Sequence, residues 1–122
     1  MTYVQPQIDF TGADLRDAGI KTAVDHADAV SEKWSENAYQ LLIKFLQSNK
    51  RFMCEDFRSY AAELDFDLPP SGRAFGGVIM RAAREFIIIK IGIQSVKNKK
   101  AHLANAGVWE RNDERMIEHG LL

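Results

Sequence analysis

Arginines recur at short intervals between residues 73 and 84, and this segment has the side chains best suited to binding a ligand. The cations here are Arg73, Arg81 and Arg84. Guanidinium groups bind phosphate and can pair bidentately with guanine, which discriminates between bases by about 1–3 kcal/mol. A second basic run follows, with lysines at 97, 99 and 100. Residues of these types at this spacing predict recognition of a nucleic acid.

The charges of the chain are divided unevenly between its two halves. The 122 residues have a formal net charge of -1. Residues 1–48 carry four Lys or Arg against seven Asp or Glu, which gives -3, whereas residues 71–111 carry eight against two, which gives +6. This asymmetry indicates an anionic partner for the second half.

A helix predicted over residues 72–86, with Ser71 as its cap, would position the arginines. Its apolar residues recur at offsets of three, four, seven and eleven, as one face of a helix requires; they are Phe75, Val78, Ile79, Ala82 and Phe86. The outer face would hold Arg73, Gly77, Met80 and Arg84, with Arg81 at its edge.

In a DNA-reading helix, the N-terminal residues meet base edges, so Arg73 is the predicted base contact. Arg81 and Arg84 are predicted to meet phosphates. Gly76 and Gly77 each cost about 1 kcal/mol inside a helix relative to alanine. Close approach of another surface would explain that cost: DNA at Gly77, and the preceding helix at Gly76.

A strand hairpin is predicted directly after this helix. Residues 87–94 alternate with a period of two, residues 95–105 are polar, and Gly107–Trp109 supplies a partner strand. The polar segment is predicted to contact phosphate or enter the minor groove through its cations and an amide. These residues are Lys97, Asn98, Lys99, Lys100 and His102.

The segments upstream complete a recognisable order of elements. Helices are predicted over residues 11–30, over 36–48 with Ser35 as cap, and over 55–64, with a short strand at 52–53 and a loop ending at Pro70. The order predicts an α+β, mostly helical fold: a winged helix-turn-helix with an added N-terminal helix and a C-terminal two-stranded wing. The predicted division is an arm at 1–10, a single domain at 11–111 (extension 11–34, winged-helix core 35–111) and an acidic tail at 112–122.

Catalysis and cofactor binding find little support in the sequence. The three histidines, at 26, 102 and 119, lie far apart, and none has a neighbour at metal-ligand spacing. Cys54 occupies a position where a hydroxyl residue usually caps a helix; a reactive thiolate there is less expected than a small packed residue. We therefore expect a non-enzymatic protein without cofactor or metal. No membrane span or signal peptide is visible, which predicts a cytoplasmic protein.

The run from Arg73 to Ile88, followed by a basic segment and Gly107-Val108-Trp109, resembles small phage and prophage proteins with a winged helix domain. The resemblance extends upstream through Trp34-Ser35, Ala38, Leu41 and Phe45, and into residues 14–20. It implies a bacterial or phage origin and binding of double-stranded DNA, in transcription regulation or replication. Cys54, in place of a hydroxyl cap, and a wing with few arginines depart from the pattern.

Two alternatives stay open at this point. Arginines on an outer helical face and lysines at a hairpin tip are also common as ordinary solvated residues. The acidic N-terminal helices, the long loop over residues 64–70 and the near-neutral total charge would also suit a module that docks on a host or phage protein, such as a replication or defence factor, which is the second interpretation. A homodimer formed through the first two helices is compatible with either function.

Overall fold

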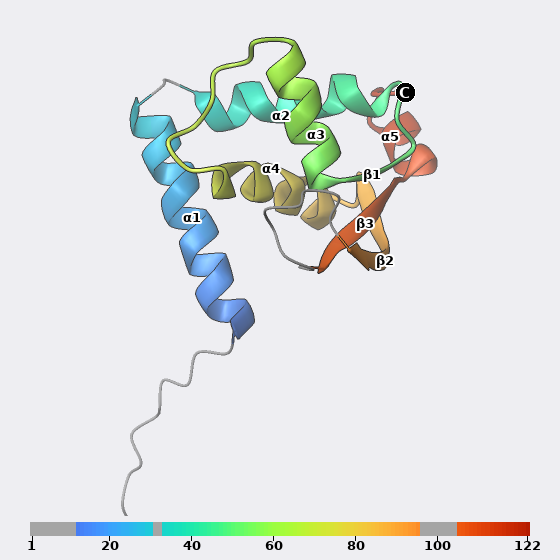
Figure 1. The fold of residues 1–122 in the computed structure, drawn as a ribbon. Helices are drawn as coiled ribbons and strands as arrows, with labels where there is room; N and C mark the ends of the chain where they lie inside the picture. The colour runs from blue at the N-terminus through green and yellow to red at the C-terminus, as the bar shows by residue number, and fades with distance from the viewer. Residues whose placement is uncertain (1–11, 31–32, 96–104) are drawn as a thin grey trace, which may run out of the picture.

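The protein is described by a computed structural model that covers residues 12–30, 33–95 and 105–122 (Figure 1). Its fold is α+β and mostly helical, with one three-stranded antiparallel sheet. The elements, in chain order, are α1 (Gly12–Val30), α2 (Trp34–Leu46), β1 (Arg51–Met53), α3 (Cys54–Glu63), α4 (Arg73–Arg84), β2 (Ile88–Ser95), β3 (Asn105–Arg111) and α5 (Asp113–Glu118).

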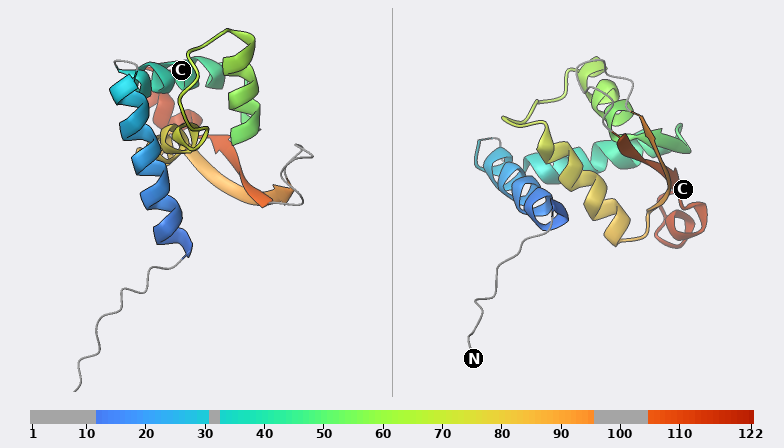
Figure 2. Two further views of the ribbon diagram at one scale, coloured as in Figure 1. Left: turned by 60° about the vertical axis from the view of Figure 1, so that its left-hand side comes forward. Right: turned by 60° about the horizontal axis from the view of Figure 1, so that its bottom comes forward.

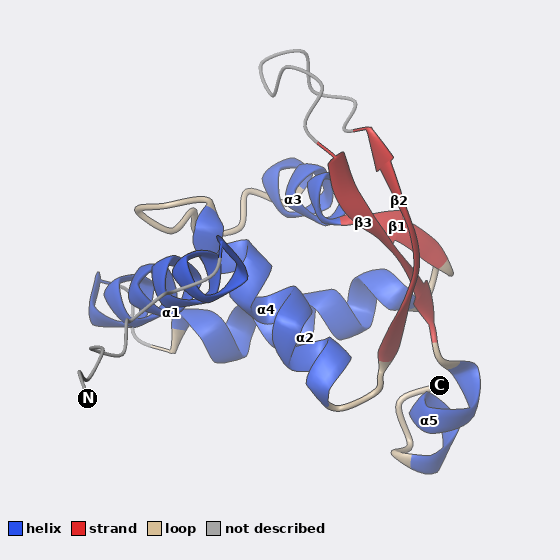
Figure 3. Ribbon diagram, turned by 90° about the horizontal axis from the view of Figure 1, so that it is seen from below, coloured by secondary structure: helices blue, strands red, loops and turns tan. Residues whose placement is uncertain are grey.

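Helix α4 lies at the centre of this arrangement. It contacts α1, α2 and α3, and it leads into the sheet through β2. Figure 1 shows α1 at one end of α4 and the sheet at the other, and the turned views of Figure 2 keep the two on opposite sides of the molecule. Seen from below, α1 runs across the N-terminal half of α4 (Figure 3).

Aromatic side chains from four elements form the centre of the core. Trp34 of α2 meets Phe75 of α4 edge to face, with 5.3 Å between ring centroids, and Phe75 meets Phe57 of α3 at 5.9 Å. The Trp34 indole N–H donates to the Asp67 carbonyl at 2.7 Å, which satisfies its buried polar atom and ties the loop before α4 to α2. The predicted apolar face of the α4 helix is thereby confirmed for Phe75, Val78, Ile79 and Ala82, which are all buried.

The sheet has the strand order β1-β3-β2, so β2 is an edge strand. The register pairs Phe52 with Trp109 and Trp109 with Lys90, and it shifts between Lys90 and Gly92. The predicted strand is present, but its isoleucines are not a core-facing row. Ile88 is buried, whereas Ile89, Ile91 and Ile93 are 49%, 47% and 65% exposed, because the hairpin extends past the helices that could cover it.

The N-terminus of α2 is capped by another helix rather than by its own residue. Ser35 was the expected cap, yet α2 already begins at Trp34, after Lys33 in a left-handed conformation (φ 59°). The Ser35 N–H and hydroxyl donate to the Asp28 carboxylate of α1 at 2.8 and 2.9 Å. Asp28 therefore satisfies a free amide at the start of α2 and fastens the end of α1 to it.

The C-terminus of α4 differs from the prediction at Phe86. The helix ends at Arg84, and Phe86 adopts a left-handed conformation (φ 59°) with its ring 62% exposed, so it does not continue the buried stripe. The Phe86 N–H donates to the Ala83 carbonyl and the Ile87 N–H to the Ala82 carbonyl. This is a Schellman ending with phenylalanine in the position that glycine usually takes.

The last residues, expected as an acidic tail without assigned structure, contain a helix in the structure. Asn112 caps α5 by accepting a hydrogen bond from the Arg115 N–H. Met116 of α5 is fully buried in the main core. The Arg111 guanidinium donates to the Leu46 carbonyl at 2.7 Å, and Asp113 accepts from the same side chain. The six residues of α5 have only weak apolar periodicity, so no helix was predicted for them from the sequence.

Candidate nucleic-acid interface

The outer face of α4 is divided between a covered part and an open part. The covered part is at the N-terminal half, where α1 crosses the helix; the open part is at the C-terminal end, where α4 turns into β2 (Figure 3). The predicted DNA-contacting residues of α4 are distributed over both parts, and their surroundings differ accordingly.

Gly77, where DNA was the expected close neighbour, lies under α1 in this structure. A Cβ atom at Gly77 would be 2.4 Å from Cγ2 of Val24 and 3.2 Å from Cγ2 of Ile20, both on α1. A Cβ at Gly76 would lie 3.4 Å from Cδ1 of Ile20, so this glycine also faces α1 rather than α3. The two glycines permit close packing of two helices within the chain, and neither presents its backbone to a partner in this arrangement.

Arg73 is also associated with α1. A Cβ at Gly19 of α1 would be 3.0 Å from a terminal guanidinium nitrogen of Arg73, so the arginine side chain lies across that glycine. Arg73 is exposed and forms no ion pair with any residue in the described part of the chain. Its charge is therefore available, although the side chain is directed along α1.

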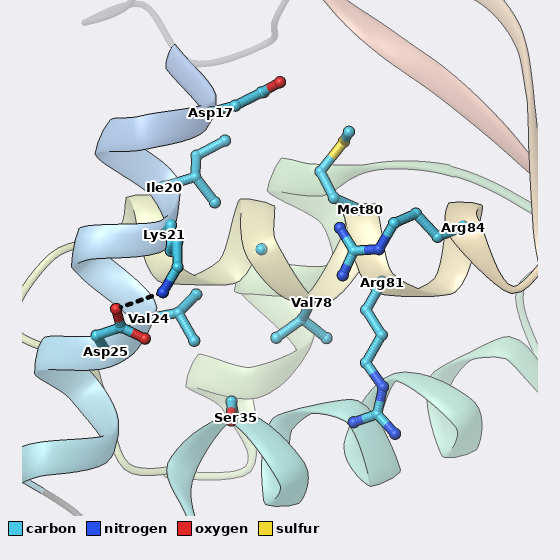
Figure 4. A pocket seen from close by; sticks show the side chains of 11 residues that line it. Asp17, Ile20, Lys21, Val24, Asp25, Ser35, Val78, Met80, Arg81 and Arg84 are labelled. Carbon is cyan, nitrogen blue, oxygen red and sulfur yellow. Dashed lines mark hydrogen bonds and ion pairs between the residues drawn. The ribbon is translucent and has the colours of Figure 1, made fainter. Parts of the chain in front are cut away.

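A groove of about 470 Å³ opens between α1 and the C-terminal half of α4 (Figure 4). Its floor is apolar and includes Ile20, Val24 and Val78, while Met80 and Arg84 rise on the α4 side. Figure 4 shows Asp17 and the Lys21–Asp25 ion pair on the α1 side, where the two charged groups are 2.9 Å apart. The groove therefore carries mixed charge along its rim.

Arg81, one of the predicted phosphate contacts, is held in an internal network in this structure. Its guanidinium forms ion pairs with Glu36 of α2 at 2.7 Å and with Glu85 at 3.0 Å. The guanidinium carbon also lies 3.8 Å from the centre of the Tyr39 ring, a cation–π contact. Two carboxylates neutralise this arginine, so little of its charge is left for an external anion.

The same network changes the titration of its members. The hydrogen bond from Arg81, assisted by one from Gln40, lowers the pKa of Glu36 below its usual range. Burial, together with the neighbouring Glu85 carboxylate, raises the pKa of Tyr39 to about 12. The Tyr39 hydroxyl donates to Glu85 at 3.2 Å. These shifts mark a structural cluster that joins α2 to α4.

Arg84 and Lys90 form the open part of the candidate interface. Arg84 is the last residue of α4 and Lys90 lies in β2; both are exposed, and neither forms an ion pair within the described part of the chain. The stem of Lys90 runs over β3, since its Cε lies 3.2 Å from where a Gly107 Cβ would be. Met80, half-buried, lies one turn before Arg84.

The remaining predicted contacts lie outside the described residues. They are Lys97, Asn98, Lys99, Lys100 and His102, all in the segment 96–104 that joins β2 to β3. Their role stays a prediction. Of the five other cations of residues 71–111, Arg81 and Arg111 are bound internally, whereas Arg73, Arg84 and Lys90 are without a described ion-pair partner.

Sequence reasoning missed the contributions of α1 and α2 to this site. Ile20 and Val24 cover the glycines of α4, and Glu36 binds Arg81. One signal was present: two adjacent glycines inside a helix call for a close neighbour, and α1 offers small residues such as Ala23 and Ala27, which the structure buries. Periodicity alone did not indicate that the small residues of α1 pack against the glycines of α4.

Other chemistry-bearing groups do not join this site. Burial raises the pKa of the Cys54 thiol, which disfavours a reactive thiolate. Within the described residues, no three or more His, Cys, Asp or Glu side chains gather where they could hold a metal ion. Among the helices that the structure describes, none combines the length and the apolar character that crossing a membrane requires.

Comparisons of the chain with protein-family models, curated proteins and solved structures gave no match.

Proposed function

We propose that the protein is a non-enzymatic, double-stranded DNA-binding protein built on a winged helix, with α4 as the recognition helix and the β2–β3 hairpin as the wing. The order from α2 to β3, the strand order β1-β3-β2 and the position of α4 before the hairpin support this assignment. The proposed role is transcription regulation or replication of a phage or mobile element, in the cytoplasm of the bacterial host.

The observation that carries the proposal is the pair of exposed cations at the open end of α4. Arg84 and Lys90 form no described ion pair. Arg84 precedes the hairpin and Lys90 lies in its first strand, and the segment that connects the two strands contains Lys97, Lys99 and Lys100. Cations that have no ion-pair partner among the described residues, and that lie on consecutive elements, suit contact with phosphates, which supply most of the affinity of nonspecific DNA binding. Arg81, fully engaged by two carboxylates, contributes little to this surface.

A fluorescence anisotropy titration with mixed genomic DNA tests the proposal. We expect binding at about 50 mM salt that weakens steeply as salt rises, because each phosphate contact releases counterions. Arg84→Ala and Lys90→Ala should each weaken binding several-fold for all sequences and reduce the salt slope by about 1. Lys44→Ala, which removes an equal and exposed charge from α2, is the matched control and should leave binding nearly unchanged. Absence of binding by the wild type at low salt would contradict the proposal.

A second candidate function, docking of a protein, is favoured by the apolar side chains exposed at the same end. Phe86 is 62% exposed and Ile93 is 65% exposed, next to the half-exposed Ile89 and Ile91. An exposed isoleucine can bury its apolar surface against a protein, but it cannot form an ion pair or hydrogen bond with a phosphate. A protein partner that survives nuclease treatment, is lost with Ile93→Lys and is kept with Arg84→Ala would favour docking over DNA binding.

A further inference from the structure

We propose that α1 and duplex DNA compete for the outer face of α4, so that base reading by α4 requires α1 to leave that face. This inference rests on the proposed DNA binding and adds the regulation of the same site. The major groove of DNA is about 12 Å wide and admits a single helix. With α1 packed against Gly77, at a distance that leaves no room even for a Cβ, the N-terminal half of α4 cannot enter a groove.

Helix α1 packs on α4 more extensively than any other two described helices pack on each other, and it does so through small and half-buried side chains. Among the described side chains of α1, only Ala23 and Ala27 are buried, and Ile20 and Val24 are half-buried. No hydrogen bond or ion pair joins a described α1 side chain to α4. Packing of small apolar groups therefore holds the two helices together, without directional bonds that would have to break first.

Most of the core lies outside α1, whose described residues contribute only Ala23 and Ala27 to its buried side chains. Its largest fully buried side chains belong to α2, α3, α5 and the start of the sheet. The Trp34 ring packs against the rings of Phe66 and Phe75, which both lie outside α1. Asp28 fastens the C-terminal end of α1 to Ser35 of α2. This geometry would let α1 swing away from α4 about its C-terminal end while the domain stays folded.

Charge makes DNA a suitable replacement for α1. Helix α1 carries four aspartates against one arginine and one lysine. Asp17 and the Lys21–Asp25 ion pair line the α1 side of the groove, and Arg84 lines the α4 side. When α1 leaves, the polyanion would take the place of an acidic helix, and Arg73, Gly77 and Met80 would face the bases. Gly76 and Gly77 would permit close approach of α1 in the free protein and close approach of DNA in the complex.

A reversible clamp between α1 and α4 tests the competition. The Cβ of Val24 lies 3.8 Å from where a Cβ at Gly77 would be, which is the mean Cβ–Cβ distance of a disulfide. The variant Val24→Cys/Gly77→Cys, made with Cys54→Ala to remove the native thiol, is measured oxidised and reduced on the same DNA. We expect affinity at least about tenfold lower when oxidised, with recovery on reduction. The single Val24→Cys variant, treated in the same way, should show no redox dependence.

The outcomes separate this inference from the proposed function. Equal affinity of the oxidised and reduced clamp for DNA would overturn the competition while leaving DNA binding intact. No binding by the reduced clamp or the wild type at about 50 mM salt would overturn both. Hydrogen exchange of the wild type gives a second readout: added DNA should speed exchange in α1 while slowing it in α4. Slower exchange in both helices would contradict displacement even if the clamp failed to form.

Discussion

The two ends of α4 carry similar residues on their outer faces, but they meet opposite surroundings. At the N-terminal half, Arg73 and Gly77 lie against α1, and the distance between the helices is set by a glycine. At the C-terminal end, Arg84 lies at the rim of a groove, and Phe86 is exposed in a left-handed turn. One helix thus offers a closed surface and an open one.

The contrast shows that a helical wheel identifies the face that points away from the apolar stripe, but not whether another helix covers that face. The buried stripe of α4 was defined by α2 and α3, and the opposite side was free to receive a further helix. An arginine in such a position is exposed to solvent, covered by the further helix or neutralised by a carboxylate. Which of these applies depends on the side chains that the neighbouring helices place beside it. Arg81 shows the third case, because Glu36 of α2 reaches it at 2.7 Å.

The largest effect that tests this contrast is expected at Gly77. Gly77→Ala places a methyl group 2.4 Å from Cγ2 of Val24, a stiff β-branched side chain, and should cost about 1–3 kcal/mol of unfolding free energy. Gly76→Ala has the same gain in helix propensity but meets Ile20 at 3.4 Å, so it should be neutral or up to about 1 kcal/mol stabilising. Chemical denaturation of both variants measures the difference.

Relief of the crowding provides the control. In the Gly77→Ala background, Val24→Ala removes the opposing methyl groups and should recover part of the lost stability, although the same change alone is destabilising. Equal stability of the Gly76 and Gly77 variants, or no recovery in the double variant, would mean that α1 does not cover this half of α4.

The second prediction compares arginines at the two ends while α1 is clamped. In the oxidised Val24→Cys/Gly77→Cys protein, Arg84→Glu should lower the affinity for DNA about tenfold, because it reverses a charge at the open end. Arg73→Glu should change it much less, since that side chain lies across Gly19 of α1. Anisotropy at low salt measures both, and a larger loss for Arg73→Glu would reverse the proposed assignment of the two ends.

Much of the fold was predictable because its signals are local. The apolar stripe of α4, the period-two strand and the helix over residues 12–30 each depend on residues near one another in sequence, and the structure confirms them. The ends of elements were less predictable. Asp28 caps α2 from seven residues away, and Phe86 ends α4 where a glycine would have been expected.

The site was predictable only in its residue types. Cationic side chains between residues 73 and 90 were found from sequence, but their partners come from α1 and α2, which lie about 40 to 60 residues earlier. Glu36 neutralises Arg81 and Val24 covers Gly77 through contacts that no local periodicity encodes. Burial and charge pairing across such separations depend on how helices cross, and crossing follows from packing of whole faces.

A smaller effect is expected at Phe86, on the open end. A phenylalanine at φ 59° is strained by its Cβ, so Phe86→Gly should raise the unfolding free energy by about 0.5–1 kcal/mol. Phe86→Ala removes the ring but keeps the Cβ, and should give no such gain. If the ring serves protein docking, both variants should lose that partner while the glycine variant gains stability. A destabilised Phe86→Gly protein would mean that the ring contributes to the fold.

The smallest effect at neutral pH concerns the network that joins α2 to α4 between the two ends. Burial and Glu85 raise the pKa of Tyr39 to about 12, against about 10 in an unfolded chain. The folded state therefore holds this proton more tightly, so stability should fall as pH rises from about 10 to about 12 and be unaffected by this group near pH 7. Denaturation of the wild type and Tyr39→Phe across that range isolates the contribution, and phenolate absorbance follows the titration. If the unfolding free energies of the wild type and of Tyr39→Phe changed in parallel with pH, Tyr39 would not be buried between α2 and α4. The covered part of α4 would then be limited to the half that α1 crosses.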